Sequence, residues 1–175
     1  MLLFAHLGLS LAAARPVRGA ALGYVLLGSM LPDIIDKPLG ELIFGTPAMG
    51  RTICHTLVFL MLLSAAAYYR RDLRLASLAG GVAAHLMLDF IWNSPRTFLW
   101  PLLGAFPRAP DLSTLDYLQQ LFRGLSDPMV ALPEMLGLSY LIYFAWQQRA
   151  DIGSQLRLRL KQMPLLTSKL WQYGS

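Results

Sequence analysis

The chain has 175 residues, of which 55% are hydrophobic and only 14% are charged, and its mean hydropathy is +0.48. Soluble domains carry about 25% charged residues, so this composition disfavours an ordinary soluble enzyme and excludes a disordered tail or a basic protein that coats nucleic acid. The net charge of +5 in so apolar a chain is best interpreted through membrane topology. A single cysteine, Cys54, excludes an intrachain disulfide.

Five apolar segments are candidate membrane helices, which need about 20 mainly apolar residues each. In chain order they are residues 1–14, 19–31, 53–69, 74–92 and 129–146. The first two are short, so soluble core helices remain an alternative for them, and the second is expected to end at Leu31-Pro32. The first cation, Arg15, follows the first apolar run, which favours a retained helix over a cleaved signal peptide. We predict an all-α, polytopic membrane bundle of about five helices.

Two other segments are expected to carry helices in a single domain of residues 1–175, with the bundle over 1–148. The outer loop 93–128 is longer than ordinary connections, and Asp111 is expected to cap a helix within 111–125. That helix suits a membrane surface, a lid over a site, or simply an exposed surface. The basic inner tail 149–175 is expected to form an amphipathic helix over 151–162 that meets anionic headgroups.

The basic residues predict the orientation of the chain. With five crossings, ten of the fifteen basic residues fall on the side of the C-terminal tail and five on the other side. The positive-inside rule therefore places the N-terminus outside and the C-terminus inside. All acidic residues except Asp72 and Asp151 lie outside or near the outer helix ends. Acidic residues influence orientation little, so their enrichment there needs another explanation.

Ionisable residues gather in the apolar segments, where they are expensive and often functional. All three histidines lie there: His6, His55 and His85. His85 and Asp89 are four residues apart and share a helix face, either as metal ligands or as a buried hydrogen-bonded pair. Asp33 and Asp36 follow the expected end of the second helix, where carboxylates also serve as caps and turn formers.

The predicted topology brings these residues to one end of the bundle. The second and fourth helices end at the outer surface, and the first and third begin there. We therefore predict a shared metal site formed by six residues: His6, Asp33, Asp36, His55, His85 and Asp89. Histidine, aspartate and water favour zinc, manganese or iron over copper, and zinc is the expected metal. Six ligands could hold one or two ions.

Three motifs in this order resemble the YdjM-like family of bacterial and archaeal inner-membrane proteins. They are Leu31-Pro32-Asp33-x-x-Asp36, Arg51-x-x-x-His55-Thr56, and His85-x-x-x-Asp89 followed by Trp100-Pro101. The likeness runs from His6 to about Pro101. It implies a membrane-bound metal-dependent hydrolase of the cytoplasmic membrane. The family motif often reads R-x-x-T-H-S, and here Cys54 and Thr56 replace its Thr and Ser; we interpret Cys54 as a small apolar filler.

The residues also resemble those of the zinc-dependent phospholipase C and single-strand nuclease superfamily. This resemblance implies that one ion is held by Asp33, His55, His85 and Asp89, and that His6 serves a neighbouring ion. The superfamily's further downstream histidine is missing, since no histidine follows His85. The resemblance therefore implies a smaller centre with one or two ions.

The leading hypothesis is hydrolysis of phosphoesters such as lipid headgroups or lipid-linked phosphates, by water whose pKa the metal lowers toward about 7. Asp36 would be a base outside the ligand shell or a second-metal ligand. Arg51 or Arg96 would stabilise charge on a phosphoryl oxygen, or would simply contact lipid headgroups.

The alternative is a non-catalytic membrane scaffold or stress-response protein with a structural metal or a His–Asp network. A transporter is disfavoured, because the polar residues cluster at one end and no inverted repeat is visible. Membrane lipid is the expected partner, and nucleic acid is not.

Overall fold

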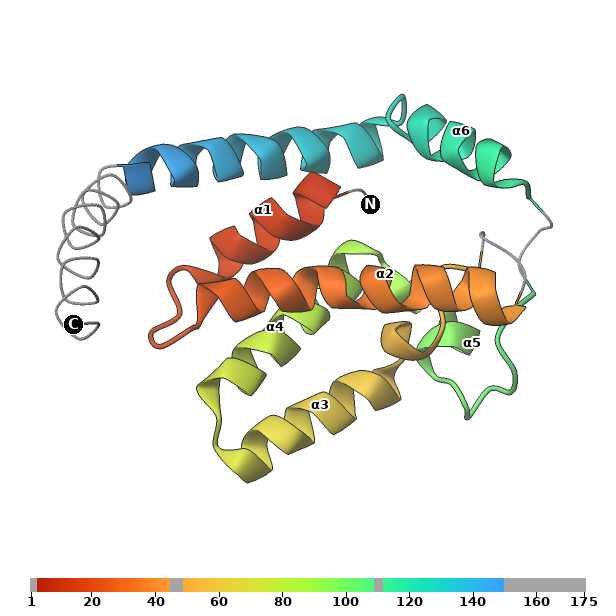
Figure 1. Cartoon of the computed structure of the whole chain (residues 1–175), viewed down its shortest axis with the longest axis horizontal. Helices are drawn as coiled ribbons and strands as arrows, with labels where there is room; N and C mark the ends of the chain where they lie inside the picture. Colours follow the sequence, from red (N-terminus) through yellow and green to blue (C-terminus); the bar gives the residue numbers. More distant parts are fainter. Residues whose placement is uncertain (1–2, 45–48, 109–111, 150–175) are drawn as a thin grey trace, which may run out of the picture. The chain divides into compact units, whose positions relative to one another are not determined.

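The computed structural model describes residues 3–44, 49–108 and 112–149, and within these ranges it contains helices and no strand (Figure 1). The helices in chain order are α1 (Leu3–Ala14), α2 (Leu22–Phe44), the 3-10 helix η1 (Ile53–His55), α3 (Leu57–Arg70), α4 (Leu73–Leu88), the 3-10 helix η2 (Ile91–Asn93), α5 (Pro95–Phe98), α6 (Thr114–Gly124) and the apolar helix Pro128–Arg149. The predicted all-α class is confirmed for this part of the chain.

The second predicted segment is longer than the sequence indicated. We expected it to end at Leu31-Pro32, but α2 continues through Pro32 and Pro38 to Phe44. A proline inside a helix costs about 3 kcal/mol, because it removes a hydrogen bond and its ring meets the preceding turn. The part of α2 beyond Pro32 contacts η1. One of these contacts is made by Asp36, one turn beyond Pro32, which accepts hydrogen bonds from the backbone of η1 and its flanking residue.

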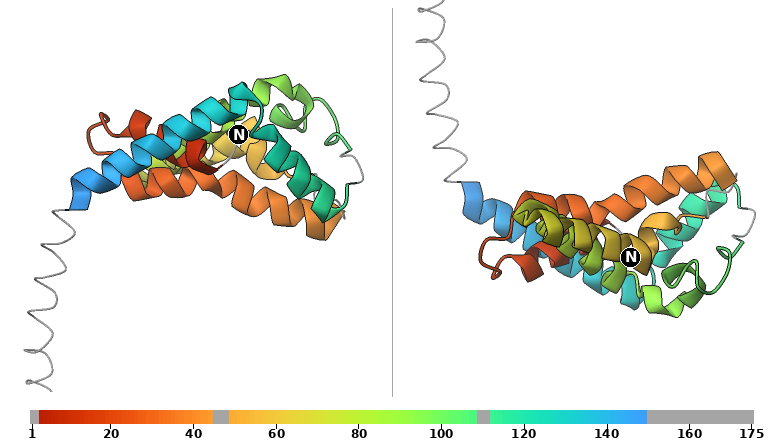
Figure 2. Two further views of the ribbon diagram at one scale, coloured as in Figure 1. Left: turned by 90° about the horizontal axis from the view of Figure 1, so that it is seen from above. Right: turned by 90° about the horizontal axis from the view of Figure 1, so that it is seen from below.

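Helix α2 packs against α1 and α4, and α3 and α4 form a hairpin beside it (Figure 2). The backbones of α2 and α4 approach closely at Gly28 and Gly81, where a Cβ atom would overlap the opposite helix backbone. Small residues allow such close approach, and this is a common way for membrane helices to pack. Beyond this contact, Val82, Leu86 and Ile91 form a small apolar core.

The helix Pro128–Arg149 contacts α1 through a second pair of glycines. Gly8 and Gly137 face each other so closely that a Cβ atom on either would overlap the opposite backbone. The chain divides into two compact units, Met1–Tyr140 and Leu141–Ser175, and both glycines belong to the first. The predicted single domain of residues 1–175 stays a prediction.

Among the described helices, Pro128–Arg149 is the one whose 22 residues are long and apolar enough to cross a membrane. Helices α1, α3 and α4 are apolar but have 12, 14 and 16 residues. The five crossings and their orientation therefore stay predictions.

The helix expected in the outer loop is present as α6, but its N-cap is Ser113 and not Asp111. The Ser113 hydroxyl oxygen accepts a hydrogen bond from the backbone N–H of Asp116, which is the bond that an N-cap supplies. Asp111 itself lies outside the described residues, as does the predicted amphipathic helix 151–162. The apolar side chains of Leu115, Leu118 and Phe122 are exposed on α6.

The close approach of α2 and α4 can be tested at two adjacent glycines of α4. Gly81→Ala should lower the free energy of unfolding by about 1–3 kcal/mol, because its methyl group overlaps the backbone of α2. Gly80→Ala is the matched control, since a Cβ atom there meets nothing within 4 Å. It should be neutral or stabilise by up to about 1 kcal/mol. Thermal unfolding of the detergent-purified variants measures the difference, and equal values for both would contradict this packing.

Candidate metal centre

The ring of His85 is anchored to α2. His85 is fully buried in the last turn of α4, and its Nδ1 lies 2.7 Å from the backbone carbonyl oxygen of Ser29. A carbonyl oxygen can only accept a hydrogen bond, so Nδ1 carries a proton and donates it. In the neutral ring, Nε2 is then left with a free lone pair.

The ring of His55 is anchored to the same helix through Asp36. Its Nδ1 lies 2.7 Å from Asp36 Oδ2, and Asp36 also accepts hydrogen bonds from the backbone N–H groups of Thr52 at 2.7 Å and Cys54 at 3.0 Å. The backbone N–H groups can only donate, so both carboxylate oxygens of Asp36 act as acceptors, and His55 Nδ1 is the donor.

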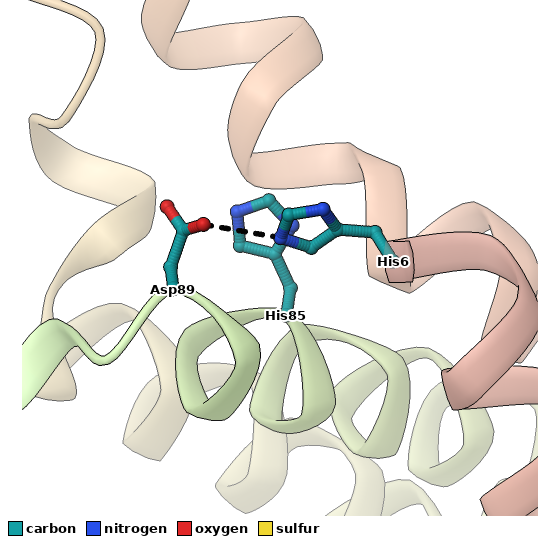
Figure 3. A group of neighbouring side chains, drawn as sticks. All are labelled: His6, His85 and Asp89. Carbon is teal, nitrogen blue, oxygen red and sulfur yellow. Dashed lines mark ion pairs between the residues drawn. The ribbon is translucent and has the colours of Figure 1, made fainter. Parts of the chain in front are cut away.

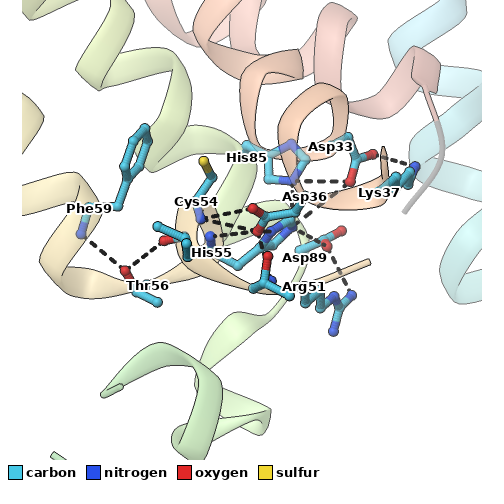
Figure 4. Close-up of polar contacts among 12 residues, drawn as sticks. Asp33, Asp36, Lys37, Arg51, Cys54, His55, Thr56, Phe59, His85 and Asp89 are labelled. Carbon is cyan, nitrogen blue, oxygen red and sulfur yellow. Dashed lines mark hydrogen bonds and ion pairs between the residues drawn. The ribbon is translucent and has the colours of Figure 1, made fainter. Parts of the chain in front are cut away.

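The two anchored rings bring their Nε2 atoms to 3.2 Å from each other (Figure 4). With both Nδ1 atoms acting as donors, two lone pairs face each other unless a cation, either a proton or a metal ion, lies beside them. Two imidazole ligands at 2.0–2.1 Å from a tetrahedral zinc ion would stand about 3.3 Å apart. The separation of the two nitrogens therefore fits a pair of zinc ligands.

Two carboxylates lie near the same pair of nitrogens. Asp33 Oδ1 is 3.9 Å from the Nε2 atoms of both His55 and His85, and Asp89 Oδ2 is 3.8 Å from His55 Nε2. These separations are somewhat wider than those between ligands of one zinc ion, and small side-chain rotations would close them. Asp33, His55 and His85 form one of the two groups in the described residues whose ligand atoms could hold a metal.

His6 contributes to the second group, together with His85 and Asp89 (Figure 3). His6 Nε2 lies 3.2 Å from Asp89 Oδ1, and the rings of His6 and His85 are tilted by 31° to each other, with 4.2 Å between their centroids. Both groups use His85, whose Nδ1 is engaged by Ser29, so its Nε2 can serve only one ion. Asp89 has one oxygen toward His6 and the other toward His55, so it could contribute an oxygen to either group.

The basic residues of the region neutralise the two carboxylates. Arg51 Nη2 lies 2.9 Å from Asp89 Oδ2, and Lys37 Nζ lies 2.7 Å from Asp33 Oδ2. Both basic side chains are nearly half exposed, whereas Asp89 is almost completely buried. Each carboxylate thus already has a positive partner on its solvent side. A metal ion would compete with these partners or displace them.

The structure separates the predicted site residues into three kinds of position. Five of the six predicted ligands converge on the centre: His6, Asp33, His55, His85 and Asp89. Asp36 lies behind His55, with both oxygens occupied by η1 and the imidazole ring, so it orients His55 and does not face the centre. Arg51 borders the centre, whereas Arg96 is exposed on α5 and within the described residues has no polar contact with it.

Sequence reasoning missed Glu134, which holds α1 in place. Glu134 is buried, and its two carboxylate oxygens accept hydrogen bonds from the backbone N–H groups of Phe4 at 2.9 Å and Ala5 at 3.2 Å. The first N–H groups of a helix lack partners within the helix, so Glu134 caps α1 immediately before His6. The available signal was a single acidic residue within the apolar segment 129–146.

A family model described as YdjM inner membrane protein matches residues 1–150. No curated protein and no solved structure matches the chain.

The cap on α1 can be tested at Glu134. Glu134→Gln should lower the free energy of unfolding by about 1.5–3 kcal/mol, because one charged acceptor is replaced by an amide N–H₂ that cannot accept. Glu41→Gln is the control, since Glu41 is exposed on α2 and surface changes usually stay within about 0.5 kcal/mol. Thermal unfolding of the purified proteins provides the comparison. Equal stability of the two variants would show that Glu134 does not hold α1.

Proposed function

Since the chain belongs to the YdjM inner membrane protein family, we propose that it is a membrane-bound metal-dependent hydrolase that cleaves phosphoesters. The observation that carries this proposal is the pair of histidine Nε2 atoms 3.2 Å apart, each with its Nδ1 engaged by α2. Such an arrangement would direct two imidazole lone pairs toward a cation. In histidines that bind metals, the other ring nitrogen usually donates its N–H to a carboxylate or a backbone carbonyl, as both Nδ1 atoms do here.

The residues proposed to hold one divalent ion are Asp33, His55, His85 and Asp89. Two nitrogens and two carboxylate oxygens suit zinc best, with manganese or iron as alternatives. His6 and the second oxygen of Asp89 are the candidates for a neighbouring ion. A divalent ion at such a site acts as a Lewis acid and lowers the pKa of bound water, which supplies a nucleophile near neutral pH.

The chain's own side chains suit an anionic substrate. Arg51 and Lys37 pair with Asp89 and Asp33. If these carboxylates held a cation, the two basic side chains would become available on the exposed side of the centre. A guanidinium at this position can pair with the oxygens of a phosphoryl group in bidentate geometry. We therefore assign Arg51 the role of stabilising negative charge on the substrate, in preference to Arg96.

Lipid headgroups or lipid-linked phosphates are the proposed substrates. Apolar side chains next to the centre are exposed: Ile34 follows Asp33, and Ile53 lies two residues after Arg51. Trp92, three residues after Asp89, is also exposed, and tryptophan is enriched at the boundary between lipid and water. A phosphoester attached to an apolar chain would match both the basic and the apolar side chains.

We propose a multi-pass arrangement with the N-terminus outside, the C-terminus inside and the centre near the outer face. The support is the unequal distribution of basic residues, ten toward the tail side and five toward the other. The apolar helix Pro128–Arg149 would be one of the crossings.

A non-catalytic role as a membrane scaffold or stress-response protein is the second candidate. It is favoured by the two ion pairs, because Arg51 and Lys37 neutralise the carboxylates without a metal. In that case the histidines and aspartates form a buried polar network that stabilises the contact of α2 with η1 and α4. A structural ion ligated only by protein is the other form of this candidate.

The metal proposal predicts the behaviour of two ligand variants. Detergent-purified protein should contain a divalent ion, measured by elemental mass spectrometry, and His55→Ala and Asp89→Asn should each lose it. Asp36→Asn should weaken binding by about 10–100-fold, because it loosens the His55 ring without removing a ligand. Asp116→Asn on the exposed face of α6 is the control. Full metal content in both ligand variants would exclude this centre.

The hydrolase proposal predicts turnover in a panel of phosphoesters and phospholipids. Arg51→Gln should lower kcat/KM by about 10²–10³-fold, because it removes a donor to developing negative charge. Arg123→Gln is the control, since Arg123 is exposed on α6. If metal-loaded wild-type protein cleaves none of the substrates, the non-catalytic candidate is favoured.

A further inference from the structure

A groove lies between α3 and α4, at the end of their hairpin remote from the candidate metal centre. Its volume is about 930 Å³, within the range of about 300–1,000 Å³ typical of small-molecule sites. The lining includes Ser64, Ala67, Tyr68, Arg71, Ala76 and Gly80. The site residues His85 and His55 lie at the other ends of α4 and α3, so this groove is a separate feature.

The groove is apolar along its length and charged at one end. Small residues of both helices, such as Ala67, Ala76 and Gly80, line its walls and leave it wide. Its charged lining residues, Arg71 and Asp72, belong to the turn that joins α3 to α4. A long apolar cavity with a charged end has the chemical character of a site for an amphipathic molecule.

The turn at this end of the groove is positive overall. It carries Arg70, Arg71 and Arg74, with Asp72 as the single acid. Of these, Arg71 and Asp72 line the groove, and the Arg74 guanidinium lies 5.9 Å from the ring centroid of Tyr24 on α2. The Asp72 carboxylate caps α4 by accepting a hydrogen bond from the backbone N–H of Arg74 at 2.7 Å. Juxtamembrane arginines of this kind attract anionic lipids. Tyr68 and Tyr69 are 87% and 89% exposed, and tyrosine is enriched at the headgroup level of membranes.

The backbone at Arg71 has a conformation that is uncommon for a residue with a side chain. Arg71 is the C-cap of α3 and adopts the left-handed conformation, with φ 49° and ψ 39°. Glycine is the usual residue at such a helix end, because side chains are disfavoured there. The turn would thus be formed more easily by glycine, and the arginine side chain lines the groove instead.

We propose that this groove binds one anionic phospholipid, with an acyl chain between α3 and α4 and the phosphate beside Arg71. The charge at the turn matches an anionic headgroup, and the apolar walls match the acyl chain. A zwitterionic lipid would fill the same apolar volume but would gain less from the arginines. The proposed lipid site is independent of the hydrolase function and would be present in a non-catalytic protein as well.

The experiment uses the full chain, purified in detergent and mixed with phosphatidylglycerol or phosphatidylcholine as probes. Native mass spectrometry counts the lipids that remain bound. Wild-type protein should retain one phosphatidylglycerol in preference to phosphatidylcholine. Arg71→Gly should weaken this retention by roughly fivefold, the effect of one basic residue near an anionic lipid. Its melting temperature should be unchanged or higher, because glycine relieves the left-handed strain.

A second variant fills the groove without changing charge. Ser64→Leu should reduce retention of the acyl chain, whereas Ala65→Leu on the adjacent, exposed position of α3 should not, because Ala65 does not line the groove. Equal retention of both lipids, or unchanged phosphatidylglycerol binding in Arg71→Gly and Ser64→Leu, would overturn the proposal. A dimer that Ser64→Leu dissociates would instead identify a second copy of the chain as the occupant, and would also overturn it.

Discussion

The hydrogen bonds of the Asp36 carboxylate are the constraint on which the candidate centre depends. One carboxylate binds the backbone of Thr52 and Cys54 and the ring of His55. It therefore fixes where η1 meets α2 and which His55 nitrogen faces the centre. The same contact explains why α2 continues beyond Pro32, since a shorter helix would leave these buried donors without an acceptor. Unpaired buried donors of this kind cost about 1–3 kcal/mol each.

Helix α2 is the scaffold that orients both histidines. Ser29 and Asp36 are seven residues apart, two helical turns, so they lie on one face of α2. Asp33, between them, shares that face. Because the Ser29 carbonyl oxygen and the Asp36 carboxylate each accept from an Nδ1 atom, both Nε2 atoms are directed to the same place. The close glycine contact of α2 with α4 brings His85 within reach of this face.

The charges around the centre connect its structure with its proposed chemistry. Asp33 and Asp89 are paired with Lys37 and Arg51 on the solvent side. If a cation at the centre were bound by these carboxylates, Lys37 and Arg51 would be free to pair with an anionic substrate. The same pairs also make a stable network without a metal. In the hydrolase the carboxylates would bind a metal ion, whereas in a non-catalytic protein without a metal they would stay paired with the basic side chains. A measurement of metal content therefore distinguishes these two cases.

The sequence by itself determined the all-α class, the approximate positions of most helices and five of the residues that converge. Apolar periodicity and the spacing of His85 and Asp89 act locally, so they can be recognised in the sequence. The position of Asp36 behind His55, the cap that Glu134 places on α1, and the continuation of α2 through Pro32 were decided only by the tertiary structure. Each depends on a contact between segments far apart in the chain, and local propensity carries no information about such partners.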